Sequence, residues 1–179
     1  MELKGLTIGI LKEIMENENR VAGIPDTVKK MVDNGAKVLV ESGAGLGSFY
    51  TDADYKNAGA EIINDPERIY NSADAILKVK EPLMNEAKNK HEVDMMKSNQ
   101  VLISFLHPSN PINHDMVKKL AQKGVISFSL DCIPRISRAQ SMDALTSMST
   151  VAGYKAIISA ACRLPKFIPM ITTAVGMFR

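Results

Sequence analysis

Short runs of apolar, β-branched residues alternate with longer amphipathic stretches, and this alternation constrains the fold more than any other feature of the chain. The runs that predict strands lie at 7–11, 37–41, 61–64, 75–80, 100–107 and 125–130. The stretches that predict helices lie at 25–34, 51–59, 66–72, 83–97, 110–124 and about 141–163. Alternation at this spacing is typical of a three-layer α/β fold, in which helices cover both faces of a mostly parallel sheet.

Local signals refine several of these elements. Thr51 and Asp54 form a capping-box pattern at the start of one helix. The runs at 100–107 and 125–130 are apolar nearly throughout, which predicts strands covered on both faces. The stretch 83–97 is polar, and we expect an exposed helix there.

Composition excludes several classes of function. The formal net charge is +2, aromatic residues make up 5% of the chain and Trp is absent, so no nucleic-acid surface is indicated. No apolar run approaches the roughly 18 residues of a membrane span, and MELKGLTIGILKE is no signal peptide, so we expect a cytoplasmic protein. Cys132 and Cys162 are interpreted as buried free thiols, with a disulfide or a catalytic thiol as alternatives. No metal-ligand spacing occurs, and His91 and His114 are expected to be solvated.

A glycine-rich stretch, ESGAGLGSFYTDADY at 41–55, follows a predicted strand. Gly43, Gly45 and Gly47 approach the GxGxxG fingerprint of dinucleotide sites, but the third glycine comes one residue early. The helix also begins only after a further gap. We interpret the stretch as a tight structural turn, and a phosphate cradle is the alternative.

Four polar features follow predicted strands. Arg20 follows the first strand, Lys80 and His107 close two others, and the loop 134–143 follows the last. Ligands of open parallel sheets bind at the carboxyl ends of the strands, where these features should converge. Arg20 and Lys80 suit a carboxylate or phosphate, and His107 suits proton transfer. The alternatives are a solvated arginine, Lys78 and Lys80 reaching water past the sheet edge, and a hydrogen-bonded rim histidine.

The loop PRISRAQSMD at 134–143 carries more polar chemistry than a connector needs. Arg135 and Arg138 offer donors, Gln140 offers a donor and an acceptor, and Asp143 falls in the first turn of the next helix. This set suits a phosphate-and-ribose ligand, which means a nucleotide. The alternatives are solvated arginines and an aspartate that complements the helix dipole, worth about 0.3–1 kcal/mol.

Three segments carry a resemblance to a known family. RVAGIPDTVKKMVDNGAKVLVESGAGLGSFYTDADYKNAGAEI, LKVKEP and PRISRAQSMDALTSMSTVAGYKA together resemble the alanine dehydrogenase / nicotinamide nucleotide transhydrogenase family over nearly the whole chain. The form of the PRISRAQSMD loop favours the transhydrogenase alpha subunit. The resemblance implies a flavodoxin- or Rossmann-like fold with a C-terminal bridging helix.

The resemblance also implies roles for individual residues. On the transhydrogenase interpretation, Gln140 and Asp143 are catalytic, and the NAD(H)-binding residues are Arg135, Ser137, Arg138, Gln140 and Asp143. NADP(H) is then bound by a separate subunit or domain. On the alanine dehydrogenase interpretation, Arg20 and Lys80 bind pyruvate, and Lys80 and His107 are catalytic.

The resemblance further implies how the chain is organised. We expect an α/β domain at 1–140, then a linker helix and tail at 141–179 that lead toward an absent NAD-binding Rossmann domain. The expected function is the N-terminal part of an NAD(P) transhydrogenase alpha subunit, inactive alone, whether the truncation is natural or a cut. The alternatives are an alanine dehydrogenase-like fragment and a non-catalytic dimerisation or docking module.

The family implies partners as well. We expect a homodimer, together with the membrane and NADP-binding subunits of a transhydrogenase that couples hydride transfer to proton translocation. The chain itself would lie peripheral to the inner membrane in the full complex.

Overall fold

The computed structural model describes residues 2–165, 171–173 and 176–178. The chain divides into two compact units, Met1–Cys132 and Ile133–Arg179, and each is described by itself. The expected division at residue 140, into an α/β domain and a linker, stays a prediction.

The first unit is built around a six-stranded sheet. Across the sheet the strands are β3 (Glu61–Ile63), β2 (Lys37–Glu41), β1 (Thr7–Ile10), β4 (Ala75–Leu77), β7 (Val101–Ser104) and β8 (Ile126–Ser129). Every neighbouring pair is parallel. Counted along the chain, the order is third, second, first, fourth, fifth and sixth, which is the Rossmann order rather than the flavodoxin order. The predicted α/β fold with a parallel sheet is confirmed.

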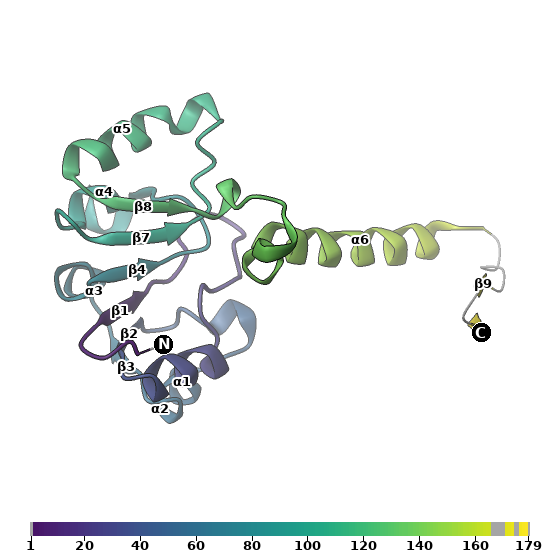
Figure 1. The fold of residues 1–179 in the computed structure, drawn as a ribbon, viewed down its shortest axis with the longest axis horizontal. Helices are drawn as coiled ribbons and strands as arrows, with labels where there is room; N and C mark the ends of the chain where they lie inside the picture. Colours follow the sequence, from purple (N-terminus) through teal and green to yellow (C-terminus); the bar gives the residue numbers. More distant parts are fainter. Residues whose placement is uncertain (1, 166–170, 174–175, 179) are drawn as a thin grey trace. The chain divides into compact units, whose positions relative to one another are not determined.

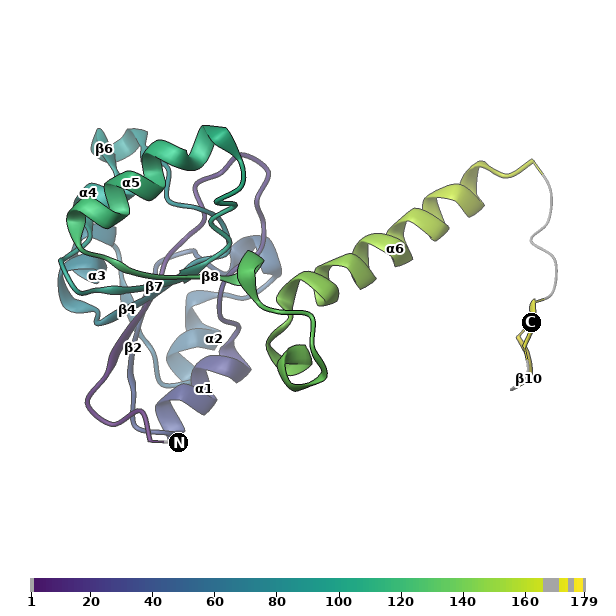
Figure 2. The same cartoon turned by 45° about the horizontal axis from the view of Figure 1, so that its top comes forward.

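Helices cover both faces of this sheet (Figures 1 and 2). The helices α1 (Pro25–Asp33) and α2 (Asp52–Asn57) lie on one face, where Val28 and Tyr55 are buried against β1 and β2. The other face carries α3 (Pro66–Ser72), α4 (Glu92–Met95) and α5 (His114–Lys123). The unit therefore has two apolar cores, one on each side of the sheet.

Helix starts follow the local sequence. Thr51 caps α2 with the predicted capping box, because its hydroxyl accepts from the Asp54 N–H while Asp54 accepts from the Thr51 N–H. Asp65 caps α3, whose bounds match the prediction. A short 3-10 turn, η3 (Pro111–Asn113), comes before α5, and Gly124 ends α5 in the left-handed region at φ 72°.

The predicted helix at 83–97 is wrong. The structure has a hairpin of β5 (Met84–Asn85) and β6 (Lys90–His91) around the 3-10 turn η2 (Glu86–Lys88), followed by the short α4. The Glu92 carboxylate accepts the Leu83 N–H at 2.9 Å and so helps to close this hairpin. His91 is half-buried rather than solvated, and its Nδ1 accepts the Val93 N–H at 3.2 Å. His114 is exposed, as predicted.

The expectation that the last strand is covered on both faces is wrong for the described residues. Ile126 and Phe128 of β8 are 47% and 58% exposed, because α1 and α2 reach only the opposite end of their face of the sheet. The buried-thiol prediction is also wrong. Cys132 follows this open edge in η4 (Leu130–Cys132), Cys162 lies on a largely exposed helix, and both are exposed free thiols.

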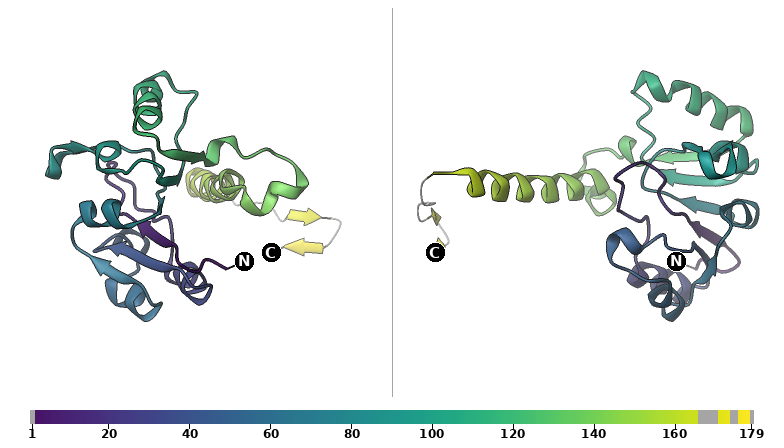
Figure 3. Two further views of the ribbon diagram at one scale, coloured as in Figure 1. Left: turned by 60° about the vertical axis from the view of Figure 1, so that its left-hand side comes forward. Right: turned by 180° about the vertical axis from the view of Figure 1, so that it is seen from behind.

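The second unit contains a 3-10 segment, η5 (Ser137–Met142), and the long helix α6 (Ala144–Arg163). Two strands follow, β9 (Ile171–Thr173) and β10 (Gly176–Phe178), which pair antiparallel (Figure 3). The sequence analysis expected only a linker here, and the rest of the tail, 166–170, 174–175 and 179, lies outside the described residues.

Candidate functional site

The sheet topology creates an opening at the carboxyl ends of β1 and β4. These two strands are neighbours, yet the helices that follow them lie on opposite faces of the sheet. Such a switch point is where open α/β sheets bind ligands. Two segments leave the sheet here, residues 11–24 after β1 and residues 78–83 after β4.

A buried ion cluster lies directly behind this opening. The Lys78 ammonium is 2.9 Å from Glu92 Oε1 and 3.4 Å from Glu13 Oε2. Tyr70 donates its hydroxyl hydrogen to the same Glu92 oxygen at 3.0 Å. All four residues are buried. The prediction that Lys78 reaches water past the sheet edge is therefore wrong, because two carboxylates hold its charge inside the unit.

Glu13 links the two strand ends. Its carboxylate accepts the Val79 N–H at 2.6 Å and the Lys80 N–H at 3.3 Å. Burial raises the pKa of Glu13, and Lys78 and the two N–H donors oppose that rise without cancelling it. For Lys78, burial lowers the pKa, but attraction to Glu92 and Glu13 outweighs burial and the pKa is raised. The cluster thus ties β1, β4 and α4 together.

Arg20 lies in the loop after β1, as predicted, and is held by its neighbour Glu18. The guanidinium donates to both carboxylate oxygens, at 2.8 Å from Nε and 2.5 Å from Nη2. These hydrogen bonds lower the pKa of Glu18, and the charge of Lys80 lowers it further. A cavity of about 200 Å³ opens beside Arg20, lined also by Glu13 and the glycine loop.

His107 follows β7 by three residues and does not close the strand, which ends at Ser104. Its backbone is left-handed, with φ 46°. Asp131 accepts the His107 N–H at 2.8 Å and the Leu106 N–H at 2.9 Å, which stabilises this conformation. The imidazole Nδ1 is 3.1 Å from Glu81 Oε2, and Nε2 is 3.7 Å from Asp131 Oδ1.

The three predicted residues of the first unit lie near one another. The Phe105 N–H donates to the Val79 carbonyl at 3.1 Å, so the chain after β7 runs beside the chain after β4. Lys80 is half-buried there, next to the Glu81 that contacts His107. Lys80 also acts on the Glu18 that holds Arg20. Arg20, Lys80 and His107 therefore share the rim around the ends of β1, β4 and β7.

The predicted loop of the second unit surrounds a cavity of its own, of about 370 Å³. Arg135, Gln140 and Asp143 line it, whereas Ser137 and Arg138 do not. Asp143 also caps α6, accepting the Thr146 N–H at 2.9 Å and the Thr146 hydroxyl at 2.6 Å. The Thr146 hydrogen bonds lower the pKa of Asp143. The predicted convergence of this loop with the rim of the first unit stays a prediction.

The glycine-rich stretch at 41–55 is a tight turn. The Asp52 carboxylate accepts the Gly43 N–H at 2.8 Å and the Ser42 hydroxyl at 2.7 Å, so an anion cannot use that amide. A Cβ on Gly45 would lie 2.6 Å from the Tyr55 ring. These contacts favour the structural interpretation of the stretch over a phosphate cradle.

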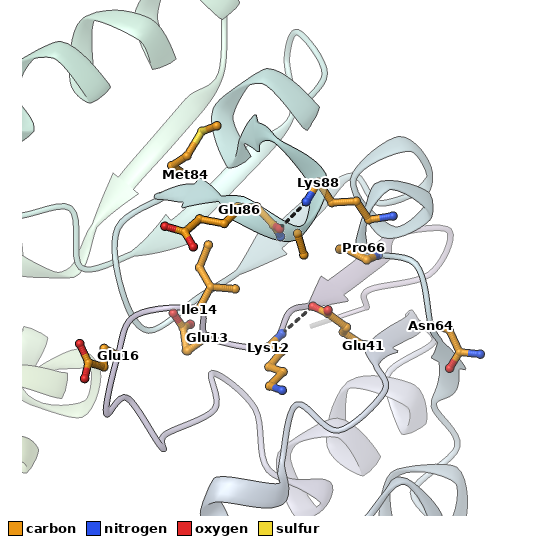
Figure 4. A pocket seen from close by; sticks show the side chains of 12 residues that line it. Lys12, Glu13, Ile14, Glu16, Glu41, Asn64, Pro66, Met84, Glu86 and Lys88 are labelled. Carbon is orange, nitrogen blue, oxygen red and sulfur yellow. Dashed lines mark hydrogen bonds between the residues drawn. The ribbon is translucent and has the colours of Figure 1, made fainter.

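A larger cavity, of about 760 Å³, lies between the chain after β1 and the 84–88 hairpin. Figure 4 shows Lys12 and Glu41 across this cavity from Glu86 and Lys88. Glu41 accepts the Lys12 N–H at 2.9 Å, and burial raises the pKa of Glu41. Its carboxylate is thus already used by the protein.

The sequence analysis missed Glu13, Glu92 and Asp131. A signal for the first two was present, because Lys78 falls within a predicted buried strand and a buried lysine requires carboxylate partners. Nothing in the sequence indicated which carboxylates these would be. In the described part of the chain, no cluster of three His, Cys, Asp or Glu side chains suits a metal ion. Likewise, none of the described helices combines the length and hydropathy of a membrane span.

Comparison with known proteins identifies the family. The family model for the alanine dehydrogenase/PNT N-terminal domain matches residues 9–152. The chain belongs to this family. The predicted resemblance is thereby confirmed, and this alanine dehydrogenase/PNT N-terminal domain has relatives of both kinds.

One relative is an NAD(P) transhydrogenase alpha subunit of Rhodospirillum rubrum, 39% identical over 96% of this chain and 44% of that protein. The alanine dehydrogenase of Bacillus subtilis is 39% identical over 84% of this chain and 37% of its own length. Among solved structures, the transhydrogenase from Sinorhizobium meliloti matches with a TM-score of 0.80 and 38% identity, over 97% of this chain and 47% of that one. The domain spans less than half the length of each of these relatives.

Proposed function

We propose that this chain is the N-terminal part of an NAD(P) transhydrogenase alpha subunit and that its 134–143 loop contacts the nicotinamide end of NAD(H). The observation that carries the proposal is the grouping of Arg135, Gln140 and Asp143 around one cavity. Identity of 39% to a transhydrogenase alpha subunit over 96% of the chain supports it.

The donor set fits a nicotinamide carboxamide. The Gln140 amide both donates and accepts, the Asp143 carboxylate accepts, and the Arg135 guanidinium only donates. Such groups orient a cofactor and tune its charge, while the bound cofactor supplies the hydride. Gln140 and Asp143 are the residues proposed at the reacting end. Ser137 and Arg138, which lie outside the cavity lining, are proposed to contact other parts of the cofactor.

The remaining parts of the activity belong to the same proposal. Residues 1–140 would form the α/β domain, and residues 141–179 would lead toward an NAD-binding Rossmann domain. NADP(H) would be bound by a separate subunit or domain, and membrane subunits would couple hydride transfer to proton translocation. The chain alone would then show no turnover, and its affinity for NAD(H) would be weak.

The test is a titration of ¹⁵N-labelled chain with NADH, followed by NMR. We expect millimolar NADH to shift the amide signals of the residues that line the 134–146 cavity. A Gln140→Ala variant should reduce these shifts, whereas Arg68→Ala, on the exposed face of α3, should leave them unchanged. Shifts confined to the rim of the first unit, or absent throughout the 134–146 segment, would contradict the proposal.

A second candidate function rests on the shared rim of Arg20, Lys80 and His107. An arginine and a lysine beside a cavity of about 200 Å³ suit a small carboxylate, and a histidine between two acidic side chains suits proton transfer. This alanine dehydrogenase-like function predicts pyruvate binding that disappears in Arg20→Ala and persists in Arg68→Ala. Pyruvate affinity that is the same in both variants would contradict it.

A third candidate is a dimerisation or docking module, favoured by the exposure of α6. Val151, Tyr154 and Ile157 are 63%, 70% and 72% exposed, although a helix that is apolar on all sides is normally buried. We expect a homodimer. Light scattering should give twice the chain mass, and a monomer at high concentration would contradict this expectation.

A further inference from the structure

The ladder between β1 and β4 ends before the rim is reached. Its last parallel pair joins Ile10 to Leu77. Beyond that pair the two chains separate, and Glu13 takes over the connection by accepting the Val79 N–H at 2.6 Å and the Lys80 N–H at 3.3 Å. One carboxylate therefore fixes the backbone of Lys80, although the sheet no longer does.

The Glu13 carboxylate is itself held from behind. Lys78 lies 3.4 Å from it and is anchored to Glu92 at 2.9 Å, which also accepts the Tyr70 hydroxyl and the Leu83 N–H. Glu13 is 7% exposed and Lys78 is 2% exposed, so water screens this network little. A side chain held in this way has few alternative positions.

The position of Lys80 follows from this arrangement. Because Lys78 and Val79 are buried and Lys80 is half-buried, Lys80 is the first residue after β4 that can reach the rim. The rim already holds the Arg20–Glu18 pair. Glu13 also lines the cavity beside Arg20. A single carboxylate thus sets the distance between the two cations that would bind an anionic ligand.

We propose that Glu13 is a positioning residue, which fixes Lys80 relative to Arg20 so that the two cations form a preorganised receptor for a small carboxylate. This inference rests on the second candidate function. Glu13 does not touch the ligand. It acts through the Val79 and Lys80 amides and through its contact with Lys78.

The test compares Glu13→Gln with Glu16→Gln, an exposed glutamate three residues away. A neutral glutamine side chain has a single acceptor oxygen, so it cannot serve both amides as the carboxylate does. We expect Glu13→Gln to weaken pyruvate binding about tenfold, measured by NMR at the Lys80 side chain, whereas Glu16→Gln leaves it unchanged. The pyruvate affinity of the unmodified chain should also fall as pH falls through the pKa of Glu13, and Glu13→Gln should lack this dependence.

A second measurement uses the unmodified chain and so does not depend on the folding of a variant. The amide protons of Val79 and Lys80 and the side-chain Cε of Lys80 should shift together with pH, with one midpoint above the ordinary pKa of a glutamate. Independent midpoints, or unchanged pyruvate affinity in a folded Glu13→Gln variant, would overturn the proposal. If the unmodified chain binds no pyruvate, the carboxylate receptor is refuted, and the shared midpoint alone then decides whether Glu13 positions Lys80.

Discussion

Replacing Lys78 with methionine tests the buried ion cluster. Methionine is unbranched and flexible, so it can fill much of the space left by the lysine stem. The substitution removes an ammonium that lies 2.9 Å from Glu92 and 3.4 Å from Glu13. Both carboxylates remain, with side chains only 3% and 2% exposed.

Breaking a buried pair by removing one partner costs about 3–5 kcal/mol, because the remaining charge is buried without compensation. Whole domains are stable by only about 5–15 kcal/mol. We therefore expect Lys78→Met to lose a large share of the free energy of unfolding, measured by urea denaturation followed by circular dichroism. Lys37→Met is the matched control, since it breaks the exposed pair with Glu61 and should cost less than about 1 kcal/mol.

The loss in Lys78→Met should also depend on pH. Burial raises the pKa of Glu13 and Lys78 opposes that rise, so the variant should have a still higher pKa at Glu13. A carboxyl with a raised pKa in the folded state favours folding at low pH, and this contribution is lost as pH rises through that pKa. The stability difference between variant and unmodified chain should therefore widen from about pH 5 to about pH 8. A Lys78→Met variant as stable as Lys37→Met, or a difference that is independent of pH, would refute the reasoning.

Three further substitutions have expected outcomes. Tyr70→Phe removes a buried hydroxyl that donates to Glu92 at 3.0 Å, and should lower the free energy of unfolding by about 1–2 kcal/mol in the same denaturation assay. Gly45→Ala places a Cβ 2.6 Å from the Tyr55 ring, and should lower the melting temperature through an overpacking cost of about 1–3 kcal/mol. Asp143→Ala removes the N-cap of α6 and should cost about 1 kcal/mol with reduced helical circular dichroism, whereas Asp143→Asn should retain most of both; equal losses in the two variants would contradict the capping role.

The sheet could be predicted from sequence because its signals are local. The strand Lys37–Glu41 was predicted at its observed bounds, since its β-branched run lies between turn residues on both sides. The helix Pro66–Ser72 was predicted as well, from a capping aspartate followed by proline. In such segments the chain neighbours alone determine the conformation.

Long-range contacts explain what the sequence analysis missed. The hairpin at 84–91 depends on the buried Glu92, whose partners Lys78 and Tyr70 lie elsewhere in the chain. A polar stretch with helical composition gives no sign of such a contact. The left-handed His107 likewise depends on Asp131, which comes from the chain after the next strand. Candidate site residues could therefore be predicted by type and strand end, but not the carboxylates that hold them.

The proposed contact between the 134–143 loop and the nicotinamide is tested most directly by intermolecular nuclear Overhauser effects in a solution of the chain with NADH. The account predicts cross-peaks between the nicotinamide ring protons and the side-chain amide protons of Gln140. Cross-peaks from those ring protons to other side chains, with none to Gln140 or its neighbours in the loop, would contradict it.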